Sequence, residues 1–286
     1  MEKVLSSHVI CNHHLTTSWL NRVESAGIGA VEIFCAPQHL NYRDRSQVED
    51  LGHWFRDSTL KLHALHSPMY TDEFWGRSGP DTHINLTEKV KAQRIHWVNE
   101  IKRAIEVAET IPFRYLIQHL GVGGQEYSDY ALEAAFSSLE ELGVFARQRG
   151  VEILLENIPN GLSTAERLEH FNKTTHLNLN YVFDTGHAHI MAGIENEWDI
   201  MKERVKSTHV HDNDGKNDNH RYPFLGSDGT VKWPKVMNLL RERQDQYPLL
   251  LELREVPEIP KAIEAAAEVF RRLEDLPEFE EDRERR

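Results

Sequence analysis

The strongest constraint on the fold is a regular alternation of short apolar runs and amphipathic segments along the chain. The runs are strand-like in length and rich in Val, Ile, Leu, Phe and Tyr. There are eight, at residues 4–11, 30–36, 60–67, 114–120, 151–158, 179–184, 206–211 and 248–253. Eight strand–helix repeats predict a parallel sheet, and in 286 residues they favour a single (β/α)8 TIM barrel over an open doubly wound sheet. No Gly-x-Gly-x-x-Gly turn follows a run, so a dinucleotide site has no support.

Helical spacing of apolar residues predicts a helix in each connection. The expected helices cover residues 18–26, 47–59, 87–110, 129–148, 196–204, 233–244 and 260–273, with a short one starting at Ser163. Thr16 and Thr17 suit the start of the first, Asn85 or Thr87 the start of the third, and Ser163 with Glu166 fits a capping box. We therefore expect one barrel domain over residues 1–273 and a fraying charged tail over 274–286.

Ionisable side chains stand at the ends of six predicted strands. They are His66, His119, Glu156, Asp184, His211 and Glu252. In five of these strands the residue two positions earlier is small or apolar and shares the same face: Ala64, Ile117, Leu154, Val182 and Leu250. Active sites of such barrels lie at the carboxyl ends of the strands, so a packed interior with a ring of polar groups above it is expected. Oxygen and nitrogen donors without Cys suit a divalent metal ion, namely Mn²⁺, Zn²⁺, Co²⁺ or Mg²⁺.

The stretch from residue 209 to 233 adds further candidate ligands. It holds three His and four Asp within 25 residues, including Asp218 and His220, which are two apart. A solvated loop is the ordinary interpretation of such a stretch, but the polar strand ends elsewhere favour a site. The chain has 17 His in all, which points the same way because His is the commonest metal ligand.

Charge and cysteine content restrict the partners and the compartment. The net charge of −13 argues against a non-specific grip on nucleic acid or on an anionic membrane. No apolar run is long enough for a transmembrane helix, and the start of the chain is too polar for a signal peptide. Two cysteines, Cys11 and Cys35, fit free thiols in a reducing compartment, so a cytoplasmic protein is expected.

Several motifs together resemble the xylose isomerase-like TIM barrels, which include sugar-phosphate isomerases, ketose 3-epimerases and the endonuclease IV type of abasic-site nuclease. The motifs are His66-Ser-Pro, Gln118-His119, Glu156-Asn157, Asp184-Thr-Gly-His187, His211-Asp-Asn-Asp-Gly215 with Asp218-Asn-His220, Leu225-Gly226, and Glu252. The resemblance covers nearly the whole chain and is specific for the superfamily, not for one reaction.

The resemblance implies a set of ligands. Glu156, Asp184, His211 and Glu252 match the metal site that the isomerases and epimerases share. His66 and His119 match the ligands of a second ion in the nucleases, and His187, Asp218 and His220 match those of a third. In the isomerase branch the position of His187 contacts substrate instead.

Other residues have two interpretations each. Glu32 is either a partner of a ligand or a buried structural residue, and His209 is expected to be a hydrogen-bonded core histidine. Lys216 and Arg221 are candidates for substrate binding, with solvated surface charge as the simpler alternative. Trp75, next to Phe74 in the long connection of residues 69–85, either walls a sugar pocket or packs a lid.

The leading hypothesis is a divalent-metal-dependent sugar or sugar phosphate isomerase or epimerase. It would act by proton transfer through a metal-stabilised enediolate, with Glu156 and Glu252 as the catalytic carboxylates and a small carbohydrate as substrate. A ketose 3-epimerase would carry an Arg near Asp218-Asn-His220, and none can be matched there. The alternatives are an endonuclease IV-like multi-zinc phosphodiesterase and a non-catalytic metal-binding barrel. The sequence leaves the sugar and the oligomeric state open.

Overall fold

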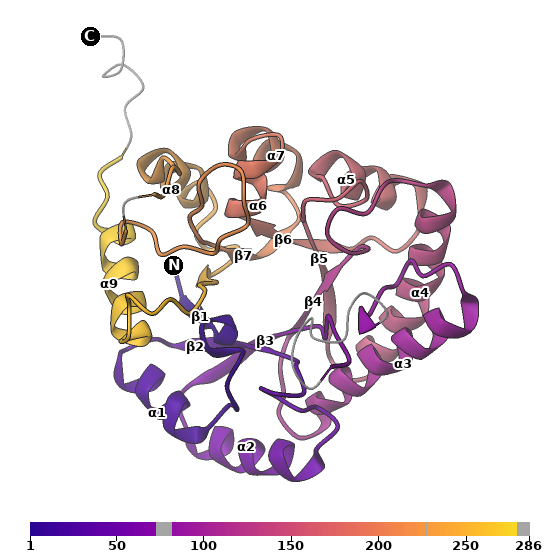
Figure 1. The fold of residues 1–286 in the computed structure, drawn as a ribbon, viewed down its shortest axis with the longest axis horizontal. Coiled ribbons are helices and arrows are strands. Elements are labelled where there is room, and N and C mark those ends of the chain that lie inside the picture. The colour runs from indigo at the N-terminus through magenta and orange to yellow at the C-terminus, as the bar shows by residue number, and fades with distance from the viewer. Residues whose placement is uncertain (73–81, 227, 279–286) are drawn as a thin grey trace.

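Eight parallel strands form a nearly closed barrel with helices around it, a single (β/α)8 TIM barrel (Figure 1). The computed structural model describes residues 1–72, 82–226 and 228–278. The strands are β1 (Lys3–Ser6), β2 (Ala30–Phe34), β3 (Lys61–His66), β4 (Tyr115–His119), β5 (Glu152–Glu156), β6 (Asn180–Asp184), β7 (Val205–His209) and β8 (Leu249–Leu251). They neighbour one another in the order β7-β6-β5-β4-β3-β2-β1-β8.

The ring closes between β7 and β8. Val210 forms a parallel bridge with Leu251, its N–H donates to the Leu250 carbonyl oxygen at 2.8 Å, and its own carbonyl oxygen accepts from the N–H of Glu252 at 3.2 Å. The predicted closed barrel is thereby confirmed, and the open doubly wound sheet is excluded.

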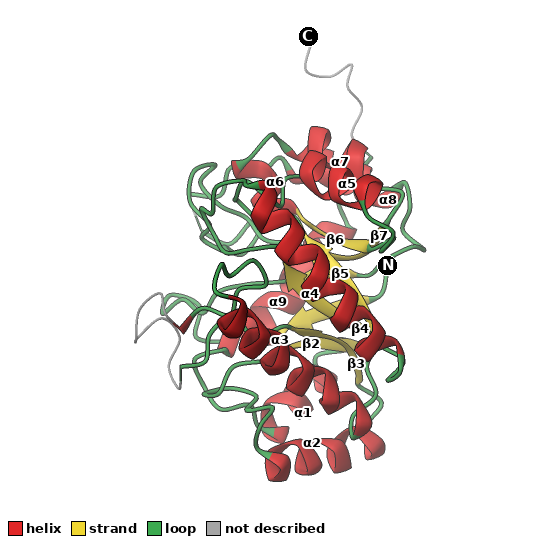
Figure 2. Ribbon diagram, turned by 90° about the vertical axis from the view of Figure 1, so that its right-hand side faces the viewer, coloured by secondary structure: helices red, strands yellow, loops and turns green. Residues whose placement is uncertain are grey.

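Helices surround the strands (Figure 2). They are α1 (Thr17–Ser25), α2 (Arg45–Asp57), α3 (Lys91–Glu106), α4 (Asp129–Arg147), α5 (Ala165–Thr174), α6 (Thr185–Ile190), α7 (Ile194–Met201), α8 (Trp233–Arg241) and α9 (Ala262–Glu274), with short 3-10 turns η1 (Ser7–Ile10) and η3 (Val107–Glu109). Among the described residues, no helix is long and apolar enough to cross a membrane.

Two apolar layers hold the barrel together. The larger lies between strands and helices and includes side chains such as Leu5, Ile33 and Phe183. Inside the ring, Ala64, Ile117, Leu154 and Val182 pack with Tyr115 in one cluster, and Val4, Ala30 and Leu250 in another. Ala64, Ile117, Leu154, Val182 and Leu250 are the residues predicted to lie beneath ionisable strand ends, and all five lie in these inner clusters.

The predicted end of the first strand and the predicted starts of two helices are wrong. The first strand ends at Ser6 and not at residue 11, because Ser6 caps η1 by accepting from the N–H of His8. Thr164 caps α5 in place of Ser163, whose hydroxyl donates to the Leu120 carbonyl oxygen at 2.9 Å. Helix α3 begins after Val90 without a side-chain cap, so neither Asn85 nor Thr87 starts it. Thr16 does cap α1.

The seventh strand ends two residues earlier than predicted. β7 ends at His209, whose backbone is in register with Asp184 of β6. Beyond the bridge at Val210, Asp212 pairs with Arg221 in an antiparallel bridge that starts a loop. His209, and not His211, therefore stands level with the end of β6.

Candidate metal centre

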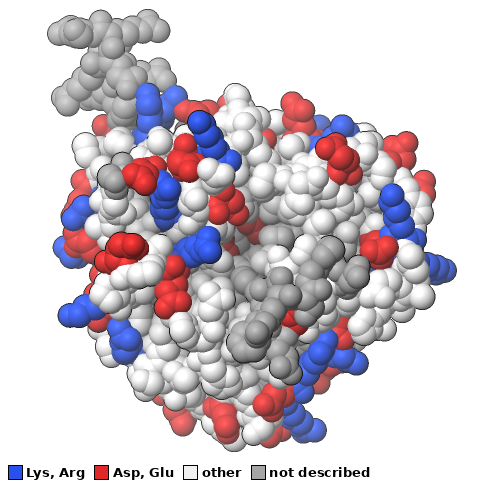
Figure 3. Space-filling model, in the orientation of Figure 1, with Lys and Arg blue, Asp and Glu red and all other residues white. Residues whose placement is uncertain are grey.

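Figure 3 looks onto the carboxyl ends of the strands, where a hollow near the middle has acidic atoms at its wall. Three groups of side chains there place donor atoms within 4.8 Å of one another. The acidic group is Glu156, Asp184, His209 and Glu252; the side group is His66, His119 and Glu156; the histidine group is His187, His211, Asp218 and His220. Glu156 belongs to two of them. All nine predicted ligand positions fall into these groups, and His209 is added.

The acidic group surrounds one imidazole with carboxylates. His209 Nδ1 lies 3.0 Å from Glu156 Oε1, 3.4 Å from Glu252 Oε2 and 3.8 Å from Asp184 Oδ2. All four side chains are buried. The strand geometry explains this convergence, because Glu156 and Asp184 end β5 and β6, His209 ends β7 and Glu252 follows β8 directly.

The other ring nitrogen of His209, Nε2, contacts a buried carboxylate. It lies 3.2 Å from the carboxylate of Glu32 on β2, which also accepts from the hydroxyl of Ser6 at 3.3 Å. His209 is hydrogen-bonded in the core, as expected, but its Nδ1 also belongs to the acidic group, which the sequence did not predict. Glu32, for which the sequence left two interpretations open, is buried and contacts His209. A carboxylate on the far side of a histidine fixes the ring and makes it a better metal donor.

The side group extends from Glu156 toward β3 and β4. His119 Nε2 lies 3.0 Å and His66 Nε2 3.5 Å from Glu156 Oε2, so the other carboxylate oxygen still faces His209. Phe34 stacks on the His66 ring with centroids 4.1 Å apart. Among the described residues, Glu156 is the member that the two groups share.

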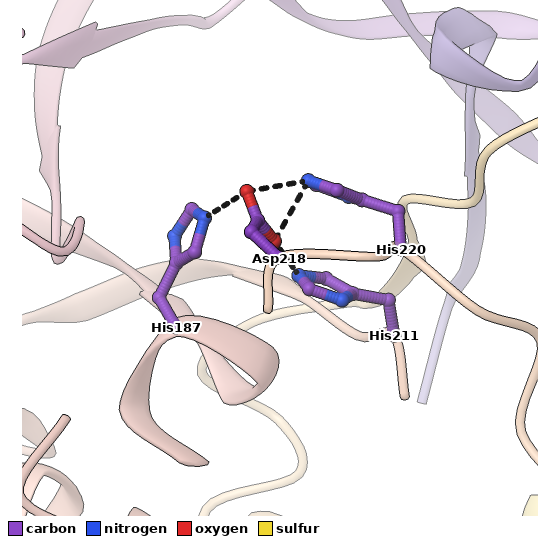
Figure 4. A group of neighbouring side chains, drawn as sticks. All are labelled: His187, His211, Asp218 and His220. Atoms are coloured by element: carbon purple, nitrogen blue, oxygen red, sulfur yellow. Dashed lines mark hydrogen bonds and ion pairs between the residues drawn. The ribbon is translucent and has the colours of Figure 1, made fainter. Parts of the chain in front are cut away.

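The histidine group comes from α6 and from the loop after β7 (Figure 4). Asp218 lies between the rings, 3.1 Å from His187 Nε2, 3.2 Å from His220 Nε2 and 3.8 Å from His211 Nε2. His211 Nε2 also lies 3.1 Å from Asp184, so this group touches the acidic group. His211 and His220 stack with centroids 3.9 Å apart.

Backbone carbonyl oxygens fix the orientation of the rings. Nδ1 of His66, His187 and His220 donates to the carbonyl oxygens of Ser67, Asn157 and Glu252 at 3.0, 2.9 and 3.2 Å. Because a carbonyl oxygen only accepts, each Nδ1 carries a proton, and Nε2 is the ring atom that faces the site. Such rings are prepared to bind a metal ion.

The loop after β7 is held by a buried carboxylate. Asp212 accepts from the backbone N–H groups of Asn213, Thr230 and Val231 at 2.8, 2.9 and 3.1 Å and from Trp233 Nε1 at 2.7 Å. A Cβ added to Gly186 would lie 2.0 Å from the His211 ring, so glycine is needed at this close approach. Asp184 itself caps α6 by accepting from the N–H of His187 at 2.6 Å.

The two glutamates of the acidic group have opposite pKa shifts. Burial opposes ionisation of Glu156, but the charges of His209 and His119 and hydrogen bonds from His119 and His187 outweigh it and hold its pKa well below 4.5. Burial raises the pKa of Glu252 well above 4.5; nearby His209 opposes this, whereas Glu156, Glu32 and Asp184 reinforce it. The two carboxyl groups of one buried site therefore have pKa values shifted in opposite directions.

The donor sets fit a divalent cation. Oxygen and nitrogen donors without sulfur, converging in a buried pocket, are the chemistry that Mn²⁺, Zn²⁺, Co²⁺ and Mg²⁺ share. The acidic group, rich in carboxylates, suits the harder ions, whereas three imidazoles with one carboxylate suit Zn²⁺. The roles of the individual residues as ligands remain predictions.

The predicted substrate-binding residues are less well placed. Lys216 is exposed on the loop after β7. Arg221 donates to the carbonyl oxygen of Asp228 at 2.7 Å and lies 3.9 Å from Asp214, so its charge is engaged within its own loop. Trp75 and Phe74 lie outside the described residues. Cys11 and Cys35 are buried free thiols.

The fold and the site define a class of (β/α)8 barrels with nitrogen and oxygen donors at the carboxyl ends of the strands, a set that could hold a metal ion. The family model of the xylose isomerase-like TIM barrels matches residues 20–273, and the chain belongs to this family. An uncharacterized protein of Methanocaldococcus jannaschii is 26% identical over 260 residues, which are 83% of this chain and 78% of the relative.

Solved structures share the fold. A D-tagatose 3-epimerase-like protein superposes with a TM-score of 0.73 and 24% identity over 96% of this chain and 99% of its own. The IOLI protein, solved with a bound zinc atom, has a TM-score of 0.72 and 18% identity over 96% of both chains. At these identities the likeness concerns the fold.

Proposed function

We propose that this protein is a divalent-metal-dependent isomerase or epimerase of a small carbohydrate. The observation that carries the proposal is the acidic group, in which Glu156 and Glu252 converge from β5 and from the end of β8 onto one buried site with Asp184 and His209. The family and the epimerase-like neighbour support the same class of reaction.

Glu156, Asp184, His209 and Glu252 would hold the ion, with His211 beside Asp184 as the predicted alternative to His209. The bound ion would supply positive charge next to the carbonyl and adjacent hydroxyl oxygens of an open-chain sugar, where negative charge develops as a C–H proton leaves. His187 would contact the sugar oxygens from the edge of the histidine group, where its Nε2 lies 3.1 Å from Asp218.

The two glutamates would move the proton. One carboxyl group would accept a proton from carbon and the other would donate one from another side, and Glu156 and Glu252 are placed for this because they reach the site from the ends of different strands. Burial of both keeps bulk water away from the charge that develops on the substrate, while the carboxyl proton exchanges with solvent between turnovers.

The test combines isotope exchange with a shortened side chain. A panel of ketoses is screened with Mn²⁺ and Co²⁺ in D₂O, and deuterium is expected at the substrate carbon because a carboxyl proton exchanges with solvent. Glu252→Asp should retain metal but lose about 10²-fold in turnover, since its oxygens retract by about 1.5 Å. Turnover without deuterium uptake would instead indicate hydride shift between carbons and leave Glu252 without a proton-transfer role.

Phosphodiester hydrolysis is a second candidate, because three connected ligand groups resemble a multi-ion site. Two measurements test this hypothesis. The first is the number of metal ions per chain. The second is cleavage of a duplex that carries one abasic site, at physiological salt with added Zn²⁺. We expect an intact duplex, given the net charge of −13. Nicking of the duplex that Glu156→Gln abolishes would establish the hydrolase in place of the isomerase.

A further inference from the structure

A groove opens at the amino-terminal ends of the strands, on the face of the barrel opposite the candidate metal centre. It has a volume of about 500 Å³ and lies between the end of α2, the start of β3, the turn that leads into β4, and Gly150 just before β5. β3 and β4 carry His66 and His119 at their other ends, so the groove and the side group are separated by the length of these strands. Small-molecule pockets of proteins span roughly 300–1,000 Å³, and this groove falls within that range.

Apolar side chains make up much of the groove's wall. Leu60, Leu62, Ile111 and Phe113 line it and are buried, and Phe55 lines it and is half-buried. A ligand that covers such a wall removes apolar surface from water, which favours binding. The wall therefore suits a ligand with an apolar body.

The charged side chains that line the groove all have the same sign. They are Arg56, Lys61 and Arg114, and the described residues around the groove include no Asp or Glu. Lys61 lies 3.4 Å from Glu2, whereas Arg56 and Arg114 form no ion pair with any described residue. Arg114 instead lies over the ring of Tyr115, with its guanidinium carbon 5.0 Å from the ring centroid. In a chain with 46 acidic and 33 basic residues, two arginines without an acidic partner at one groove are available to an anion from outside.

A carboxylate at the edge of the groove is engaged by other groups. Glu24 accepts from the hydroxyls of Ser58 and Thr59 at 3.1 and 2.6 Å and from the backbone N–H of Thr59 at 2.9 Å, and both of these residues line the groove. Neither arginine pairs with Glu24. The positive charge of the groove is consequently not neutralised at Arg56 and Arg114.

The two features together define the ligand. Guanidinium N–H groups bind two oxygens of a carboxylate or phosphate at once, and the apolar wall accommodates a hydrocarbon body. We propose that this groove is a binding site for a small anion with an apolar body, namely an aryl or alkyl carboxylate or phosphate. The site is separate from the candidate metal centre, and the inference does not depend on the proposed function.

The test uses a charged dye and its uncharged analogue. The probe is 8-anilinonaphthalene-1-sulfonate, an aryl anion whose fluorescence rises on binding, and N-phenyl-1-naphthylamine is the same molecule without the sulfonate. Both are titrated into the Mn²⁺-loaded protein and into the EDTA-treated protein. Arg56→Gln and Arg114→Gln should each weaken binding of the anion by about fivefold, and the double variant by about twentyfold. Binding of the uncharged analogue should stay at the parental value in all three variants.

Arg167→Gln is the matched control. Arg167 also lies over a tyrosine ring, with its guanidinium carbon 4.0 Å from the centroid of Tyr127, and it also forms no ion pair with a described residue. It is not among the residues around the groove, so Arg167→Gln should bind the anion as the parent does. Thermal unfolding of each variant checks that the fold is intact, which is expected because Arg56 and Arg114 are exposed.

Three outcomes would overturn the assignment. The first is parental affinity for the anion in a folded double variant, or an equal loss in Arg167→Gln. The second is loss of binding on removal of Mn²⁺, which would place the anion at the metal centre. The third comes from competition: 4-phenylbutyrate or phenyl phosphate should displace the dye, and displacement by a short acidic peptide but by neither small anion would make the groove a protein-docking surface instead.

Discussion

The acidic group and the histidine group lie side by side yet are built differently. Every member of the acidic group stands at the end of a strand or one residue beyond it, and all are buried. The histidine group draws on a short helix and a loop, and the side chain of Asp218 is 37% exposed. The paired backbone of a strand fixes the donors at its end. The donors on the loop after β7 depend instead on Asp212, whose carboxylate accepts hydrogen bonds from the backbone of that loop. This comparison predicts a tight ion in the acidic group and a more exchangeable one in the histidine group.

The largest effect is expected for Glu156→Gln, because Glu156 serves both the acidic group and the side group. Mutating a residue that only supports a ligand costs about 10- to 100-fold in metal affinity. Glu156→Gln removes a ligand's charge, so metal binding should weaken by more than about 100-fold and turnover should be abolished. Calorimetric titration with Mn²⁺ and Zn²⁺ checks this. Glu152→Gln at the opposite end of β5 is the control and should bind as the parent does. Parental affinity in Glu156→Gln would refute its assignment as a ligand.

A smaller and more specific difference is expected between His209→Ala and His211→Ala. His209 lies at the centre of the acidic group, so its loss should weaken the tight ion by about 100-fold, whereas loss of His211 should mainly release the exchangeable ion. The absorption spectrum of bound Co²⁺, followed during titration, separates the two ions. The reverse outcome would restore the ligand set that the sequence implied, with His211 beside Glu156.

The third prediction concerns the pH dependence of stability. Burial opposes the charged form of His209, but Glu252, Glu32 and Glu156 hold its pKa well above 6.5, and the pKa of Glu252 is raised well above 4.5 chiefly by burial. For a group with a raised folded-state pKa, the stabilisation is complete below the ordinary value and is lost as the pH rises through the folded-state value. Metal-free protein should therefore lose stability above pH 4.5 as Glu252 titrates and above pH 6.5 as His209 does.

The slope should be about 1.4 kcal/mol per pH unit for each proton. Glu156 has the opposite sign, because its lowered pKa removes stability only as the pH falls below 4.5. A bound cation replaces the protons, so the rise in Tm on adding Mn²⁺ should grow between about pH 5 and pH 8. Scanning calorimetry with and without EDTA measures it. A rise in Tm that shrinks over this range would contradict the assignment of Glu252 and His209 to one ion.

The sequence predicted the barrel because periodicity reports directly on strands and helices. It also predicted which residues stand at the strand ends, since alternation places Leu154 under Glu156 and Val182 under Asp184. It missed that His209 is level with Asp184, because two histidines spaced two apart satisfy the alternation equally and only the pairing register separates them. The cap on α5 was missed because the Ser163 hydroxyl has a distant backbone partner, Leu120.

The groove with Arg56 and Arg114 also lay beyond sequence reasoning. These residues lie in separate parts of the chain, and whether a charged side chain has a partner depends on the whole surrounding structure and not on its neighbours in the chain. The same holds for the contact between Glu32 and His209, which are 177 residues apart.

Closure of the ring by β8 also has a consequence for biosynthesis. Val210 pairs with Leu251 late in the chain, and this pairing sets the backbone of Glu252. A nascent chain that has emerged only through β7 carries Glu156, Asp184 and His209 but lacks the fourth donor and the strand that closes the barrel. The candidate metal centre therefore cannot have all four donors in place until β8 has been synthesised and paired, because Glu252 follows the strand that closes the ring.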